Sequence, residues 1–160
     1  MLKKTIKYTD YDGNQREEEF LFNMSKADVI EWLVTNGDYT YDKLIDQMSK
    51  KRDGKAIMGV FKDLIYRSYG EKSVDGRRFI KSQEVKDNFM ETEAYSELFV
   101  ELITDAKKAA EFLNAVIPKD LSDLVSETIA KNPDATPEQL KEILGSTDGE
   151  VVALPGAKNA

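Results

Sequence analysis

The sequence of 160 residues contains no cysteine and no histidine. Without cysteine, the chain has no disulfide, no thiol nucleophile and no cysteine-ligated zinc site. Without histidine, it has no serine–histidine–aspartate triad, no histidine-ligated metal site and no histidine pH switch. Carboxylates, lysines and tyrosines remain available for chemistry, but no pattern of them indicates a catalytic, cofactor-binding or metal-binding site. The composition therefore favours a binding or assembly protein over an enzyme.

Long apolar runs and an excess of positive charge are also missing. No run approaches the roughly 20 apolar residues of a membrane span, and residues 1–7 lack the apolar stretch of a signal peptide. Lysine and arginine number 23 against 30 acidic residues, which gives a net charge of −7. Phosphate backbones repel such a chain. We therefore expect no membrane partner, no nucleic-acid partner and a location in the cytoplasm of the producing cell.

Residues 3–22 have the pattern of a β-hairpin. Residues 5–9 alternate polar and apolar side chains, Asp12-Gly13 is a common hairpin-turn dipeptide, and residues 20–22 form an apolar return strand. A lone hairpin is marginally stable in water. This hairpin is therefore expected to lie on the helices, to pair with more strands or to pair with a partner.

From Ser25 onward the apolar periodicity is helical, with apolar side chains recurring every three or four residues. Residues 70–78 interrupt it with two glycines and five charges, and they are expected to form an exposed loop. The expected helix N-caps are Ser25, Thr40, Asp53, Ser82, Thr92 and Thr104. The expected core residues are Phe22, Ile30, Leu33, Leu44, Ile57, Phe61, Leu64, Phe79, Leu98, Phe99, Leu102, Leu113 and Ile117.

Residues 119–160, after Pro118, differ from the rest. They carry a net charge of −4 from four lysines and eight acids, and they contain no aromatic residue. Two amphipathic helices are expected up to about residue 144, followed by a flexible end. We therefore predict a mainly α fold. An N-terminal β-hairpin packs on a small helical bundle in residues 1–118, and residues 119–160 form a loosely attached, acidic C-terminal helical tail.

Two features are candidates for partner contacts. Residues 77–81 form a basic cluster with an aromatic residue, which is open to three interpretations: a solvated loop with its apolar residues in the core, a protein contact, or a grip on a nucleic-acid strand. The only tryptophan is either a core residue or an interface anchor. The candidate partner-binding residues are Trp32, Arg77, Arg78 and Phe79.

Five stretches of the chain resemble a known protein family. They are residues 3–8, 22–27, 69–82, 92–99 and 104–114, which together include Tyr69-Gly70-Glu71-Lys72-Ser73 and Thr104-Asp105-Ala106-Lys107-Lys108. Over residues 1–118 the sequence resembles the tail assembly chaperones of long-tailed, siphovirus-type phages or prophages of Gram-positive bacteria. Members of that family have no catalytic residue to transfer to this chain.

The resemblance implies a specific role. Such a chaperone binds the long tape-measure protein, keeps it soluble and promotes polymerisation of the tail tube around it. It contacts the tail-tube protein directly or through a frameshifted long form, it self-associates, and it is absent from the finished virion. Two alternatives remain open: a structural component of the tail or head–tail connector, and a small regulatory protein that binds a host partner.

Overall fold

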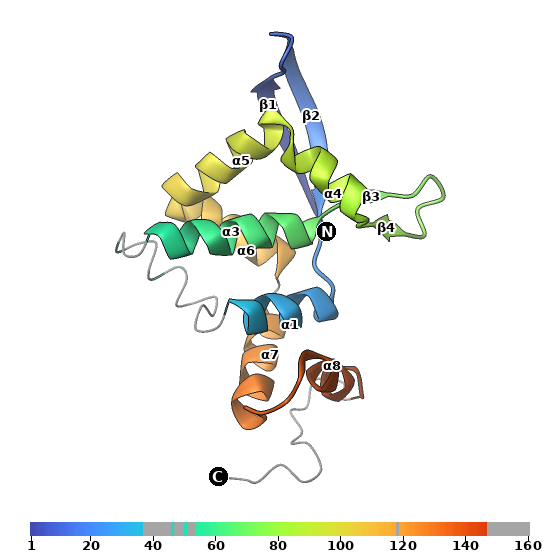
Figure 1. Cartoon of the computed structure of the whole chain (residues 1–160), viewed down its shortest axis with the longest axis vertical. Helices are drawn as coiled ribbons and strands as arrows, with labels where there is room; N and C mark the ends of the chain where they lie inside the picture. The colour runs from blue at the N-terminus through green and yellow to red at the C-terminus, as the bar shows by residue number, and fades with distance from the viewer. Residues whose placement is uncertain (37–45, 47–49, 51–53, 118, 147–160) are drawn as a thin grey trace.

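The computed structural model describes residues 1–36, 46, 50, 54–117 and 119–146. The described part is mainly α-helical and begins with a β-hairpin, which confirms the predicted fold class (Figure 1). Its elements are β1 (Leu2–Thr9), β2 (Gln15–Phe22), α1 (Lys26–Thr35), α3 (Gly54–Ser68), β3 (Tyr69–Lys72), β4 (Phe79–Ile80), α4 (Gln83–Met90), α5 (Glu93–Thr104), α6 (Ala106–Val116), α7 (Lys119–Lys131) and α8 (Pro137–Ser146).

The strands form one antiparallel sheet in the order β1-β2-β3-β4. The prediction that residues 70–78 are all loop is wrong, because residues 70–72 belong to β3 and only residues 73–78 connect it to β4. Leu21 and Phe22 of β2 pair with Gly70 and Tyr69. Since these partners are far apart in the sequence, a local pattern of glycine and charge could not reveal the pairing.

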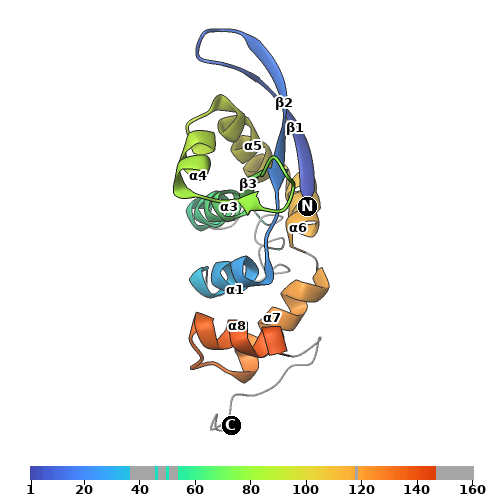
Figure 2. The ribbon, with the colours of Figure 1, turned by 90° about the vertical axis from the view of Figure 1, so that its right-hand side faces the viewer.

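The sheet has one covered face and one exposed face. Ile6 is buried on the face toward the helices, and Phe22 on the same face is completely buried. Lys3 and Thr5 lie on the opposite face and are exposed. The covered face continues into an aromatic cluster, where the Phe22 ring lies 5.3–5.8 Å from three other rings: Tyr69, Phe89 and Phe112. This cluster packs the hairpin on the helices, and the far end of the hairpin extends beyond them (Figure 2).

Most of the predicted caps are confirmed where they fall within the described residues. Ser25 and Asp28 form a complete capping box, and Ser82 and Thr92 cap α4 and α5. Thr104 is a correction: its hydroxyl donates to the Val100 carbonyl, so it ends α5, and the next residue, Asp105, caps α6. Thr40 and Asp53 lie outside the described residues.

The predicted core is confirmed at the positions that the structure describes as buried. These are Phe22, Ile30, Ile57, Phe61, Leu64, Leu98, Leu102, Leu113 and Ile117. Phe79 and Phe99 are half-buried instead. Phe99 packs against the margin of the apolar cluster, and the Phe79 ring lies against Gly70. Leu44 and the side chain of Leu33 fall outside the described part.

The two expected C-terminal helices are present as α7 and α8. They lie at the end of the molecule opposite the hairpin, and α1 lies between them and α3 (Figures 1 and 2). Val125 of α7 and Leu140 of α8 are buried and belong to the same apolar cluster as the core of residues 1–117. No feature of the sequence predicted this contact with α1. The residues expected to be flexible, after about 144, lie mostly outside the described part.

Candidate functional site

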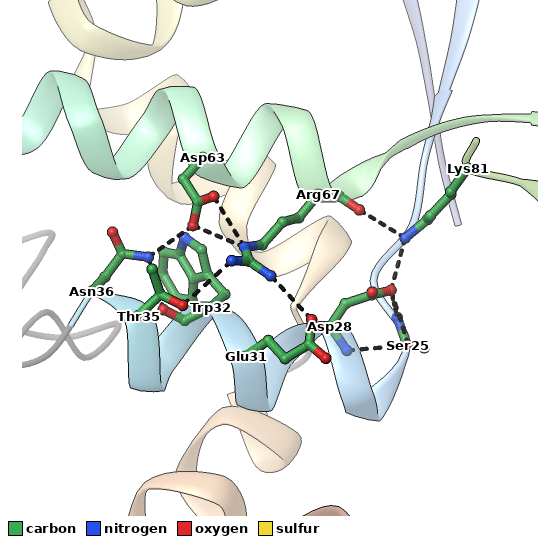
Figure 3. Close-up of polar contacts among 9 residues, drawn as sticks. All are labelled: Ser25, Asp28, Glu31, Trp32, Thr35, Asn36, Asp63, Arg67 and Lys81. Atoms are coloured by element: carbon green, nitrogen blue, oxygen red, sulfur yellow. Dashed lines mark hydrogen bonds and ion pairs between the residues drawn. The ribbon is translucent and has the colours of Figure 1, made fainter. Parts of the chain in front are cut away.

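A polar network joins α1 to α3 (Figure 3). The Arg67 Nε donates to both carboxylate oxygens of Asp63, at 3.0 and 2.9 Å. From the same guanidinium, Nη1 donates to Glu31 at 3.1 Å across the gap between the helices. A guanidinium holds two carboxylates well because its donors are fixed in one plane. Arg67 therefore sets the position of α3 on α1.

Lys81, directly after β4, extends this network to the sheet (Figure 3). Its ammonium donates to the carbonyls of Asn23 and Arg67, at 2.5 and 2.8 Å, and to the Asp28 carboxylate at 2.7 Å. Burial alone would raise the pKa of Asp28, but hydrogen bonds from Lys81 and Ser25 outweigh it and lower the pKa. The end of β4 is thus fastened to the start of α1 and the end of α3.

The β3–β4 loop (residues 73–78) is held in one conformation by its own hydrogen bonds. The Ser73 amide donates to the Arg78 carbonyl at 2.8 Å, which closes the loop. Asp75 accepts from the Ser73 hydroxyl at 2.6 Å and from the Arg77 amide at 3.1 Å, and these bonds lower its pKa. Gly76 has a φ of 73°, which favours glycine. A loop of this kind presents its side chains in a fixed arrangement.

The β3–β4 loop displays cationic and apolar groups together. Val74 is fully exposed, and both arginines, Arg77 and Arg78, are exposed. Within the described residues no carboxylate lies at ion-pair distance from either guanidinium. Phe79 is half-buried, and its ring lies on Gly70, where a Cβ atom would be only 2.6 Å from Cε1. The structure therefore brings three of the four candidate residues together.

Trp32 does not join them. Its side chain is 0% exposed, and it lies between α1 and α3 on the Asp63 side of the network, away from Lys81 (Figure 3). Its Nε1 has no hydrogen-bond partner in the part of the chain that the structure describes. Of the two interpretations that the sequence leaves open for Trp32, its burial favours the core residue, because a fully buried ring offers no surface to a partner.

Sequence reasoning placed Lys81 in the basic cluster of residues 77–81 but missed its role as an anchor, and it missed the second hairpin. Asp75-Gly76 is the same turn dipeptide as Asp12-Gly13, and it could have indicated β3 and β4. No local signal marks Lys81, because its acceptors come from three separate segments.

Within the described residues, no three side chains are arranged to hold a metal ion. No helix in the same part of the chain is long and apolar enough to cross a membrane.

Comparison with known proteins supplies the family. The family model described as "Phage tail assembly chaperone" matches residues 1–160. The match therefore includes residues 119–160, which resemble the family least, as well as residues 1–118. No curated protein and no solved structure is significantly similar to the chain. Because the family model spans the whole sequence, the chain belongs to the phage tail assembly chaperone family.

Proposed function

We propose that the chain binds the tape-measure protein during tail assembly, keeps it soluble and promotes polymerisation of the tail tube around it. The observation that carries this proposal is the family match over residues 1–160. A tape-measure protein is long, so many copies of a small chaperone can bind along it. Many weak contacts give high avidity while each remains reversible. Reversibility lets tail-tube subunits displace the chaperone.

The β3–β4 loop, extended to Phe79, is the proposed contact surface for the client. Exposed guanidinium groups bind carboxylates strongly, and the exposed apolar Val74 can contact the apolar face of a client helix. Because the loop is already ordered by hydrogen bonds, binding costs little conformational entropy. Trp32 is left out of this surface because it is buried.

The remaining partners follow from the same role. The tail-tube protein is recruited directly or by a frameshifted long form, and neighbouring copies of the chaperone contact one another along the client. These steps take place in the cytoplasm of the bacterial host, the proposed phage is long-tailed with a Gram-positive host, and the chaperone leaves before the virion is complete. Mass spectrometry of purified virions tests the last point, since finding this chain in stoichiometric amounts would favour a structural component.

Co-expression with the tape-measure protein of the same phage tests the proposed function. The soluble fraction of the tape-measure protein is expected to rise strongly when the chain is present. The double variant Arg77→Glu, Arg78→Glu is expected to lose most of this effect. Lys62 is an exposed residue on α3, and Lys62→Glu changes the charge by as much as either arginine substitution does alone. This control variant is expected to keep the solubilising effect. If the wild-type chain leaves the tape-measure protein insoluble, the proposed function is wrong. If the wild-type chain solubilises it and the double variant does so equally well, the proposed contact surface is wrong.

A further inference from the structure

Among the described residues, no strand pairs with the outer edge of β1, because β1 is the first strand in the sheet order. The Asp10 amide donates to the Asn14 carbonyl across the hairpin. In an antiparallel pair, the backbone groups of successive residues point alternately toward the partner and away from it. This alternation and the register with β2 direct the N–H and C=O groups of Lys3, Thr5 and Lys7 toward the open edge.

A groove runs beside this edge. Buried Leu98 and Leu102 hold α5 against the sheet, and the space between α5 and residues 4–7 has a volume of about 360 Å³. A second hollow of about 340 Å³ continues it toward Leu2 and α6 and shares some of the same residues. Val100, on the α5 side of the groove, is 50% exposed. Most of the other lining side chains are polar or charged, so Val100 is the exposed apolar contact that the helix side offers to a strand added to β1.

The charges of β1 select the occupant. The strand contains Lys3, Lys4 and Lys7 and no acidic residue, in a chain with a net charge of −7. The Lys4 ammonium is paired with Glu101 at 2.8 Å, and Lys108 reaches the same carboxylate at 3.0 Å. Lys3 and Lys7 are exposed on the other face of the strand. Edge lysines oppose pairing with basic strands, and two β1 strands paired together would assemble six lysines in one ribbon.

We propose that the open edge of β1 binds an extended segment of a partner protein in which acidic and apolar residues alternate. Its backbone pairs with Lys3, Thr5 and Lys7, its acidic side chains lie beside the exposed ammonium groups, and its apolar side chains lie in the groove against Val100. This mode of recognition adds a fifth strand to the sheet. The site is separate from the β3–β4 loop and goes beyond the proposed function, so a negative result here leaves the co-expression test unchanged.

A synthetic peptide of nine residues that alternates glutamate with valine or threonine is the probe, and the full chain is the receptor. Thr5→Pro removes an amide that points to the open edge and leaves the bonds to β2 in place. It is expected to weaken binding, measured by fluorescence anisotropy, by about tenfold or more. The matched variant Thr5→Val keeps the amide and is expected to bind within about twofold of wild type. Amide chemical shifts are expected to change mainly in residues 2–7 and in α5.

A second variant keeps the test decisive if Thr5→Pro fails to fold. The exposed double substitution Lys3→Glu, Lys7→Glu is expected to abolish binding of the acidic peptide and to allow binding of a peptide with lysine in place of glutamate. The proposal is overturned if the acidic peptide does not bind at millimolar concentration, or if the shifts map to residues 73–78. It is also overturned if the chain alone forms a dimer that Thr5→Pro abolishes, because the occupant is then a second copy.

Discussion

The Lys81 ammonium lies 2.7 Å from the carboxylate of Asp28, and the same carboxylate accepts the Ser25 amide at 2.8 Å. One aspartate therefore both caps α1 and anchors the residue that follows β4. Asp28 and Lys81 are 53 residues apart in the sequence, so this contact joins two distant segments of the chain. It also fixes the base of the β3–β4 loop, which is the proposed client contact.

Replacing Lys81 with methionine tests this anchor. The substitution keeps the apolar stem but leaves the Asn23 and Arg67 carbonyls and the Asp28 carboxylate without their shared donor. The free energy of unfolding is expected to fall by about 2–4 kcal/mol. The exposed control Lys72→Met is expected to change it by less than about 0.5 kcal/mol. Urea unfolding measures both, and equal effects would contradict the assigned role.

The pKa of Asp28 predicts how stability depends on pH. Because the pKa is lowered in the folded state, the unfolded chain takes up the proton more readily as the solution is acidified. The contribution of Asp28 to stability is complete well above its ordinary pKa of 3.8 and is lost as the pH falls below that value. The stability difference between wild type and Asp28→Asn is therefore expected to shrink between about pH 7 and about pH 3. Urea midpoints across that range measure it, and a constant difference would contradict the prediction.

Gly70 is predicted to tolerate no side chain. A Cβ atom there would lie 2.6 Å from Phe79 Cε1 and 2.9 Å from the Ile80 carbonyl, which is backbone and cannot turn aside. Gly70→Ala is expected to lower the free energy of unfolding by about 1–3 kcal/mol, since β3 and β4 must separate. Gly59→Ala, in α3 with nothing within 4 Å, is expected to raise it by about 0.5–1 kcal/mol. Thermal unfolding distinguishes the two, and the opposite signs make the comparison sensitive.

Trp32→Ala is expected to lower the stability of the fold, and not to remove a direct contact with the client. Removing a fully buried indole leaves a cavity between α1 and α3, at a cost of about 3–5 kcal/mol. Trp32→Phe is expected to cost less, because it also removes the Nε1–H that lacks a partner. Chemical denaturation measures both variants. If Trp32→Ala kept wild-type stability and lost only client binding, the assignment of this residue to the core would be wrong.

Local patterns predicted the local features well. The capping box at Ser25, the turn at Asp12-Gly13 and the apolar stripe of α3 depend on residues within a few positions of one another. The features that were missed depend on distant partners. β3 exists because β2 offers it a backbone edge. α7 and α8 contact α1, and Val125 and Leu140 are buried in the common apolar cluster.

The candidate site follows the same division. The sequence identified Arg77, Arg78 and Phe79 as a group because they are consecutive. It could not place Trp32, since a lone tryptophan on a helix fits a core or an interface equally well by periodicity. The sequence also contains no sign that Lys81, two residues after Phe79, holds the base of the β3–β4 loop in place. The three acceptors of Lys81 become neighbours only in the folded chain.

The most direct test of the central claim is the mass of the complex formed with the tape-measure protein. The two proteins are co-expressed, and the soluble fraction is separated by size-exclusion chromatography with light scattering. The account predicts one species that contains the tape-measure protein and many copies of this 18.1 kDa chain. A chain that elutes alone at its own mass, with the tape-measure protein in the insoluble fraction, would contradict it.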